Sequence, residues 1–503
     1  MAQPMNLLFL MSDQQRHDAL GFLNPVLQTP HLDRLAREGI HCPQTFSPTP
    51  VCLPCRCSMV TGQYPSTHGA TCNGSHLPPD YPYTVADYLN GQGYRTHLIG
   101  KSHLSNCHDP ASLESAPRIH DREYYRKWNG PWYGFSQATL NIGHSTEGHA
   151  CGMHYGVWLE DHGIDTDQYF GRTSYTANGA WDLPAELHNS AWIAEQVIAS
   201  LDQSQTDGRP FYIWANFQDP HNPCMVPEPW ASMYRPEEVP FRGLPPEAAG
   251  AMAAKPAFYG EILAQPGEYA AKPTDPGLRG AGDICSLPWD EAEARRNVAA
   301  YYGMVSLMDH HIGRILEALE ARGMLENTLI VFTSDHGDCL GDHGFWFKSM
   351  VTYDESMRVP FLARLPEKLP AGKTSSTPQN LLDVFPTFLN LAGLPQPWFL
   401  EGTDQAVCWT GGEGTEDAFA VVEERPYATS WNKRVIITRR YALAYYAERP
   451  DGELYDRETD PHHVYNRWPD PAFQEVRDSL IRRLLDREMN KTGVRPTPGK
   501  YIG

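Results

Sequence analysis

The sequence predicts an α/β fold with one large, mostly parallel β-sheet sandwiched between helices, and a smaller C-terminal α+β subdomain with a short antiparallel sheet. Apolar runs of strand length alternate with stretches of helical periodicity, and glycines close several of those stretches. Near residue 405 this alternation stops. A chain of 503 residues also exceeds the size at which a single core stops growing. We therefore expect two units, residues 1–405 and residues 406–503.

The elements of the first unit follow one another at regular intervals. Residues 5–11 are apolar except at Asn6 and have the length of a strand, and Thr29-Pro30 is typical of a helix start that Gly39 would end. The remaining elements are expected in this order: helix 84–90, strand 95–100, helix 190–201, strand 211–216, helix 291–322, strand 328–333 and helix 381–392.

Two long segments, 105–185 and 220–290, interrupt this order. They are rich in Pro, Gly, Trp, Tyr and His and have no clear period, which is typical of functional lids or interface elements. The aromatic- and histidine-rich residues 130–154 predict either a pocket mouth or an aromatic-packed insertion at a subunit contact. Beyond residue 405 we expect short antiparallel strands and a final helix, over 418–422, 434–439, 441–446 and 473–488.

Composition restricts the partners. The formal net charge of −20 argues against nucleic acid, and an anionic substrate would need positive charge concentrated locally at its site. Eleven cysteines in a chain this long indicate no disulfide framework. The first residues lack a basic segment, and the apolar run is too short for a signal peptide or membrane span. We expect a soluble, cytoplasmic protein with no membrane partner.

Polar clusters follow four of the expected strands. They are Asp13-Gln14, Lys101-Ser102-His103, Asp219-Pro220-His221 and Asp335-His336-Gly337. Because the carboxyl ends of parallel strands share one edge of a sheet, these clusters should converge on one crevice. The sequence therefore predicts a site with acids, several histidines and a lysine.

Residues 52–62 read Cys-Leu-Pro-Cys-Arg-Cys-Ser-Met-Val-Thr-Gly. Cys52 followed by Pro at +2, Arg56 at +4 and Thr-Gly at +9 and +10 resembles the signature of the type I sulfatases of the alkaline phosphatase superfamily. Further segments resemble the family in its own order: Asp13, Gly100–His103, Pro220-His221, Asp335–Gly337, Lys348, 353–360 and 453–461. Gln14 and His336 stand where many members have Asp and Asn, as in a branch that includes choline sulfatases and phosphonate monoester hydrolases.

The resemblance implies a modified nucleophile and a metal. In the family this cysteine is oxidised to formylglycine (3-oxoalanine) by a formylglycine-generating enzyme, and the hydrated aldehyde attacks sulfur. One divalent ion, Ca²⁺ or Mn²⁺, would then be held by Asp13, the residue at position 52, Asp335 and His336. Zinc binding by the cysteine thiolates at 52, 55 and 57 is the rival interpretation, but no second Cys pair accompanies them.

The same resemblance implies roles for the other matching residues. Arg56 would hold the hydrate and the acidic oxygens, and Lys101 and Lys348 would clamp the sulfate oxygens. His221 would be the general acid, and His103 the base that expels sulfate. Asn73 would contact the substrate, although an Asn-Gly turn explains it equally well.

These implications predict a sulfatase that hydrolyses a small aryl or alkyl sulfate monoester. The alternative is a phosphonate monoester or phosphodiester hydrolase, whose members tend to lack the Lys-x-His segment that Lys101 and His103 supply here. A non-catalytic scaffold would have lost part of the catalytic set, and an alkaline-phosphatase-type enzyme would need Ser or Thr at position 52. The family resemblance and the Pro-rich C-terminal residues predict a homodimer or homotetramer.

Overall fold

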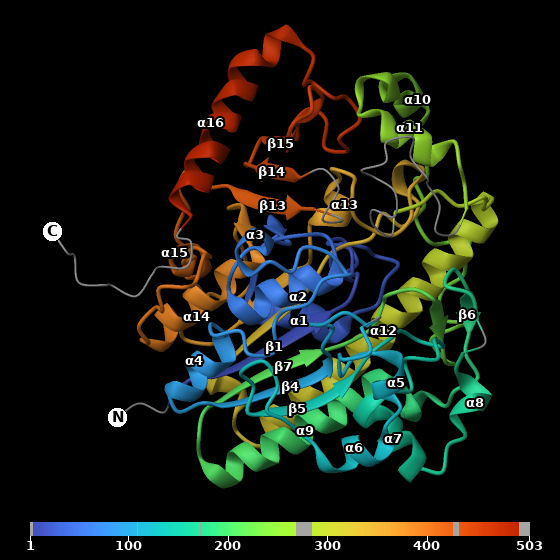
Figure 1. Cartoon of the computed structure of the whole chain (residues 1–503), viewed down its shortest axis with the longest axis vertical. Helices are drawn as coiled ribbons and strands as arrows, with labels where there is room; N and C mark the ends of the chain where they lie inside the picture. The colour runs from blue at the N-terminus through green and yellow to red at the C-terminus, as the bar shows by residue number, and fades with distance from the viewer. Residues whose placement is uncertain (1–3, 108, 172, 268–283, 426–431, 492–503) are drawn as a thin grey trace, which may run out of the picture.

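A computed structural model describes residues 4–107, 109–171, 173–267, 284–425 and 432–491 (Figure 1). Its main sheet has eight strands in the order β11-β2-β10-β9-β1-β7-β4-β5. In chain order the strands are β1 (Asn6–Ser12), β2 (Ile40–His41), β4 (Arg95–Lys101), β5 (Gln137–Asn141), β7 (Phe211–Asn216), β9 (Thr328–Ser334), β10 (Phe361–Arg364) and β11 (Lys373–Thr374). Only β10 runs antiparallel to its neighbours among these strands. The predicted mostly parallel sheet is confirmed.

The central strand β1 shows why helices cover both faces of the sheet. All of its residues are buried, and successive side chains point to opposite faces. Leu7 and Phe9 pack in one core with α2 (Cys52–Thr61), α4 (Val85–Gly91) and α14 (Val384–Ala392). Leu8 and Leu10 pack in a second core with α1 (Pro30–Glu38), α9 (Asn189–Asp207) and α12 (Glu291–Ala321). None of the helices within the described ranges combines the length and apolar character needed to cross a membrane.

The C-terminal subdomain is a four-stranded antiparallel sheet of β13 (Ala420–Glu424), β14 (Lys433–Ile437), β15 (Tyr441–Tyr446) and β16 (Gly452–Asp456). Helix α16 (Gln474–Asn490) lies along it, with Leu480 and Leu484 in the shared core (Figure 1). The fourth strand escaped prediction because Glu453 interrupts its apolar pattern. That carboxylate is fully buried and accepts hydrogen bonds from tyrosine hydroxyls. The domain boundary near residue 405 stays a prediction.

The segment 105–185 contains more regular structure than its composition predicts. Strand β5 extends the main sheet beyond β4, and α7 (Met153–Asp161) packs nearby. Elements this short, rich in His and aromatic residues, are too brief for a period to show. The other short helices and strands are β3 (Thr45–Phe46), α3 (Pro65–His68), α5 (Ala116–Ile119), α6 (Arg122–Lys127), α8 (Thr166–Tyr169), β6 (Asn178–Ala180), β8 (Cys224–Val226), α10 (Pro246–Ala251), α11 (Ala257–Leu263), α13 (Asp354–Met357), β12 (Gln379–Asn380) and α15 (Ala406–Trp409).

Glycine at position 100 allows the backbone of β4 to pack closely against that of β7 at the carboxyl ends of both strands. Its φ of +92° lies in the left-handed region, and a Cβ there would lie 2.1 Å from the carbonyl oxygen of Asn216. Only glycine fits this close approach of two backbones. The next residue, Lys101, is thereby placed at the carboxyl end of β4.

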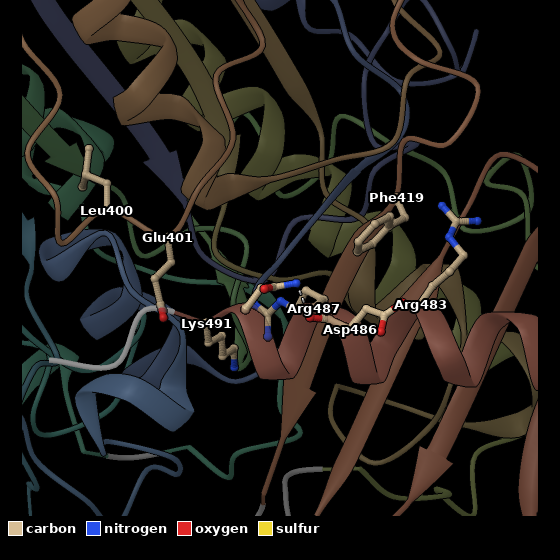
Figure 2. A pocket seen from close by; sticks show the side chains of 8 residues that line it. Leu400, Glu401, Phe419, Arg483, Asp486, Arg487 and Lys491 are labelled. Carbon is tan, nitrogen blue, oxygen red and sulfur yellow. Dashed lines mark hydrogen bonds between the residues drawn. The ribbon is translucent and has the colours of Figure 1, made fainter. Parts of the chain in front are cut away.

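Buried charges fasten α16 to the sheet. Glu423 on β13 is 1% exposed and accepts hydrogen bonds from Arg487 Nη1 at 3.1 Å and from the Ser66 backbone at 2.9 Å. Lys491 also donates to it, and the Arg487 guanidinium lies 3.9 Å from the ring centroid of Tyr64. These cations line an open pocket of about 480 Å³ between α16 and residues 400–401, with Leu400, Glu401, Phe419, Arg483, Asp486 and Asn490 (Figure 2).

The close approach at Gly100 predicts an unequal effect of two matched substitutions. Gly93 has a similar φ of +87°, but a Cβ built there would have no atom within 4 Å. Gly93→Ala should therefore lower the free energy of unfolding only by the strain of a left-handed alanine, roughly 1–2 kcal/mol. Gly100→Ala should cost about 1–3 kcal/mol more, because the new methyl group meets backbone. Urea unfolding measures both. Equal losses in the two variants would show that the β4–β7 contact is not tight.

The Glu423 cluster predicts an acid-dependent loss of stability. Burial alone would raise the pKa of Glu423, but the charges of Arg434, Lys491 and Arg487 lower it from 4.5 to about 2. A carboxylate with a depressed pKa stabilises the fold above its unfolded pKa, and that contribution is lost as the pH falls from about 4.5 toward 2. Glu423→Gln should therefore lower the free energy of unfolding by about 3 kcal/mol at pH 7.

The difference in the free energy of unfolding between wild type and Glu423→Gln should stay constant above about pH 5.5 and become smaller only below about pH 4.5. Urea titrations at several pH values measure it. Glu320→Gln is the control, because Glu320 is 60% exposed in its ion pair with Arg34. A difference that is already closing at pH 6 would contradict the assigned charge cluster.

Candidate active site

The four polar clusters meet at the carboxyl ends of β1, β4, β7 and β9. A cavity of about 390 Å³ opens there, and Cys52 lies at its wall. The other described lining residues are Asn73, Lys101, His103, Cys107, Glu114, Ala116, Ile142, Gly143, His144, Glu147, His149, Tyr175, His221 and Lys348. The pocket beside α16 brings no comparable set together, since its innermost cations are paired with Glu423 and Glu488. The cavity at the strand ends is therefore the candidate active site.

Arg56 organises the floor of this site. It follows Cys52 by four residues on α2, so both side chains project from the same side of the helix. Its guanidinium lies 2.9 Å from Asp335 Oδ2 and 3.3 Å from Asp13 Oδ2, and all three side chains are fully buried. Nη1 also donates to Asn216 Oδ1 at 3.0 Å and to the Lys101 carbonyl at 3.1 Å.

Asp13 stays ionised in this environment. Burial alone would raise its pKa, but the charges of Lys101 and Arg56 hold the pKa well below its usual range. Two carboxylates, Asp13 and Asp335, thus remain side by side in the core.

The residues expected to hold a metal lie together. Ligand atoms of Asp13, Cys52, Asp335 and His336 all lie within 4.8 Å of one another. His336 Nε2 is 3.1 Å from Cys52 Sγ and 3.6 Å from Asp335 Oδ1. Its Nδ1 donates to the Gly337 carbonyl at 2.9 Å, which leaves the Nε2 lone pair facing the cluster. Burial lowers the pKa of His336 to about 4, so the ring is neutral and can ligate. This donor set fits a divalent cation.

Cys52 itself is a poor nucleophile as a thiol. Burial, and then the charge of Asp13, raise its pKa to about 12, whereas nucleophilic cysteines need a lowered pKa. The neighbouring cysteines are turned elsewhere: Cys55 Sγ donates to the Asp335 carbonyl at 3.0 Å, and Cys57 Sγ to the Leu104 carbonyl at 3.7 Å. The three thiols therefore do not share one metal, which argues against the zinc interpretation.

Two lysines supply positive charge on the cavity side of this cluster. Lys101 Nζ contacts Asp13 and lies 2.7 Å from His144 Nε2. Lys348 Nζ lies 2.8 Å from His221 Nε2 and donates to Gln14 Oε1 at 2.6 Å. Gln14 thus orients a lysine here. An otherwise acidic protein gathers local positive charge where an anion would bind.

The two imidazoles beside these lysines are stacked. The rings of His144 and His221 are 3.5 Å apart and nearly parallel, at 8°. His221 Nδ1 donates to the Asn222 carbonyl at 2.6 Å, so Nε2 accepts the hydrogen bond from Lys348. Burial lowers the pKa of His221 well below its ordinary value, which agrees with a neutral ring. To act as an acid, His221 must first be protonated at Nε2. The Lys348 ammonium group is the adjacent proton donor.

The remaining predicted residues line the same cavity. His103 has a φ of +50°, and its buried Nδ1 has no hydrogen-bond partner among the described residues. Burial, and then the charge of Lys101, lower the pKa of His103, so its ring is neutral. Asn73 Oδ1 accepts a hydrogen bond from the Leu53 backbone at 3.2 Å. The turn from Cys72 to Ser75 is also present, so neither interpretation of Asn73 is excluded.

Several lining residues were not predicted individually. His144 and His149 belong to residues 130–154, which were expected at a pocket mouth, and both line the cavity, whereas Glu147 in the same segment was not singled out. His144 and Glu147 follow β5, the strand hidden inside the irregular segment. The rule that placed the other clusters at strand ends would have found them once β5 was recognised. Glu114 and Tyr175 come from loops, and no sequence signal marked them.

Comparisons with known proteins agree with this geometry. The model of the family described as Sulfatase matches residues 5–394, and that of the N-sulphoglucosamine sulphohydrolase C-terminal region matches residues 341–490. An arylsulfatase of Clostridium perfringens is 28% identical over 494 residues, covering 96% of this chain and 94% of the relative. A choline-sulfatase of Rhizobium meliloti is 27% identical over 479 residues, covering 92% and 82%.

Among solved structures, the phosphonate monoester hydrolase of Silicibacter pomeroyi superposes with a TM-score of 0.77 at 24% identity, over 97% of this chain and 96% of that one. This likeness shows the fold. Because the Sulfatase model spans most of the chain and the sheet has the expected topology, the protein belongs to the sulfatase family of the alkaline phosphatase superfamily.

Proposed function

We propose that this hydrolase is a formylglycine-dependent sulfatase that cleaves a small aryl or alkyl sulfate monoester with the help of one divalent metal ion. The observation that carries the proposal is the pairing of a buried cluster of acids around Cys52 with two lysines, Lys101 and Lys348, that face the same cavity. The acids suit a cation, and the lysines suit the oxygens of an anionic ester.

The metal site supports this function through its donors. Asp13, Asp335, His336 and the residue at position 52 would hold the ion, Ca²⁺ or Mn²⁺. Such an ion, when bound, makes a nearby hydroxyl more acidic and neutralises negative charge. The high pKa of the Cys52 thiol favours a modified residue at position 52. A formylglycine-generating enzyme would oxidise the side chain to an aldehyde, and addition of water to that aldehyde would supply two hydroxyl groups there.

The charged residues of the cavity would divide the remaining tasks. Lys101 and Lys348 would meet the sulfate oxygens, whose negative charge must be balanced in the transition state. His221, supplied by Lys348, would protonate the leaving oxygen, and His103 would accept the proton when sulfate is released. Arg56 does not line the cavity; it would act by holding Asp13 and Asp335 in place.

The alternative is a phosphonate monoester or phosphodiester hydrolase with the same nucleophile and metal. The name and fold of the Silicibacter pomeroyi relative support it, as do Gln14 and His336. Lys101 and His103 favour sulfate, because both line the cavity, and the phosphonate monoester hydrolases tend to carry neutral groups at these two positions. A homodimer or homotetramer and a cytoplasmic location stay predictions.

Turnover of two esters with the same leaving group tests the proposal. We expect a kcat/KM for 4-nitrophenyl sulfate at least tenfold above that for 4-nitrophenyl phenylphosphonate, because two lysines can balance charge on three non-bridging oxygens of the sulfate, whereas the phosphonate has two such oxygens and a phenyl group in place of the third. Cys52→Ala should abolish both activities. Cys57→Ala is the control, since Cys57 points away from the cavity toward Leu104. It should retain activity.

Peptide mass spectrometry across residues 51–56 gives the fraction of aldehyde in each preparation, and rates are divided by that fraction. A kcat/KM tenfold higher for the phosphonate than for the sulfate would show that the protein is a phosphonate monoester hydrolase and not a sulfatase. Full activity in a preparation whose peptide carries only the thiol would overturn the formylglycine nucleophile.

A further inference from the structure

The proposed function assigns no role to His144, which follows β5 and lines the cavity. Its Nε2 lies 2.7 Å from Lys101 Nζ and 3.6 Å from Asp13 Oδ2. Its ring stacks on that of His221, with 3.5 Å between the ring centroids. His144 is therefore in contact with a lysine expected at the sulfate oxygens and also with the expected general acid.

The hydrogen bonds of His144 assign a direction to each of its ring nitrogens. An ammonium group can only donate, so His144 Nε2 accepts from Lys101. In a neutral ring the one proton is then on Nδ1, which donates to Glu147 Oε2 at 3.1 Å. Glu147 thus selects the tautomer in which the Nε2 lone pair is directed at the lysine.

The backbone at His144 is held in place as well. Its amide donates to the same oxygen of Glu147 at 2.9 Å. The neighbouring Ser145 Oγ donates to the Pro223 carbonyl at 2.8 Å, which ties this loop to the segment that follows His221. A side chain whose backbone and ring are both fixed can position a flexible neighbour.

Lys101 is such a neighbour, because lysine has a long and flexible side chain. Among the described residues its ammonium group contacts only Asp13 and His144. An ammonium group has three protons, so one remains for an oxygen of the substrate. With Asp13 alone the group could turn about a single contact. The second acceptor, His144 Nε2, fixes the direction of the remaining proton.

The second lysine of the cavity is held by a histidine of a different kind. Lys348 donates to His221 Nε2 at 2.8 Å, and His221 Nδ1 donates to a backbone carbonyl. His144 Nδ1 donates to a carboxylate instead, and a hydrogen bond to a charged acceptor is the stronger one. His144 is thus held more firmly in one tautomer, whereas His221 has to gain and lose a proton as the general acid.

We propose that His144 is a positioning residue for Lys101, and that Glu147 sets the tautomer on which this role depends. His144 keeps the ammonium group of Lys101 directed at an oxygen of the sulfate, and it acts through Nε2 and not through its stacking on His221. The inference rests on the proposed function, because it assigns Lys101 to the sulfate oxygens.

Two substitutions of His144 separate the hydrogen bond from the stacking. His144→Gln provides an amide oxygen as acceptor but no ring, whereas His144→Phe retains a ring but has no acceptor. We expect His144→Phe to lower kcat/KM for 4-nitrophenyl sulfate about tenfold or more, and His144→Gln to stay within about threefold of the wild type. Rates are divided by the aldehyde fraction of each preparation, and metal content is measured alongside.

The opposite order, with the larger loss in His144→Gln, would show that His144 acts by packing against His221. Equal losses in the two variants would also refute the positioning role, because only one of them lacks an acceptor for Lys101.

Glu147→Ala in two backgrounds tests the part assigned to Glu147. It should lower kcat/KM about five- to tenfold in the wild type and have little effect in His144→Gln, because an amide has no tautomer to select. The same loss in both backgrounds would refute the coupling. Glu160→Ala is the matched control, because Glu160 is 55% exposed on α7 and paired with Arg126. It should leave kcat/KM unchanged in both.

Binding of inorganic sulfate provides a readout that does not need turnover. Calorimetry should show that His144→Phe weakens sulfate binding about five- to tenfold and that His144→Gln binds sulfate as the wild type does. Undiminished binding by His144→Phe would overturn the positioning of Lys101. If the expected order of affinities holds but the wild type hydrolyses no sulfate ester, the sulfatase assignment fails and the positioning role stands.

Discussion

The site depends on one buried cation, the guanidinium of Arg56, held between two carboxylates. Asp13 and Asp335 are fully buried, and two like charges so close would repel one another without it. Arg56 suits this task because its planar fork can bond several acceptors at once, here the carboxylates together with Asn216 and a backbone carbonyl. Removing it would leave Asp335 without its arginine partner and Asp13 with Lys101 alone, so the ends of β1 and β9 and the start of α2 depend on one another.

Much of the fold and most of the site were predictable because both follow from the geometry of parallel strands. Buried strands such as β1 and β9 are continuous apolar runs, and their carboxyl ends meet at one edge, which brings Asp13 and Asp335 together. Strand β5 was not predictable, since it is short and lies in a segment without a period, and Glu147 was missed with it. His144 was expected only as one of several residues at a pocket mouth. Strand β16 was hidden by Glu453, whose burial is balanced by hydroxyl groups, two of which, those of Tyr259 and Thr352, come from distant parts of the sequence. Such tertiary compensation leaves no local signal.

The cavity combines three chemical environments over a short distance. A cluster of acids and one imidazole surrounds position 52, two lysines line the cavity beside this cluster, and a separate carboxylate lies beyond His144. Burial lowers the pKa of His336, which keeps the ring neutral and able to ligate a metal, and burial also raises the pKa of the Cys52 thiol, which makes it a poor nucleophile. A site that holds a metal well therefore holds an unmodified cysteine nucleophile badly, which is a physical reason for a modified side chain at this position.

Metal content tests the central claim most directly, that Arg56 holds two carboxylates as part of a cation site. Purified protein is equilibrated with Mn²⁺ or Ca²⁺, desalted and subjected to elemental analysis, with circular dichroism to confirm folding. We predict one ion per chain in the wild type, less than about a tenth of that in Asp335→Asn because a charged ligand is lost, and one ion in the control Asp309→Asn, whose buried carboxylate accepts backbone hydrogen bonds from α1. A full complement of metal in folded Asp335→Asn, or none in folded wild type, would contradict this account.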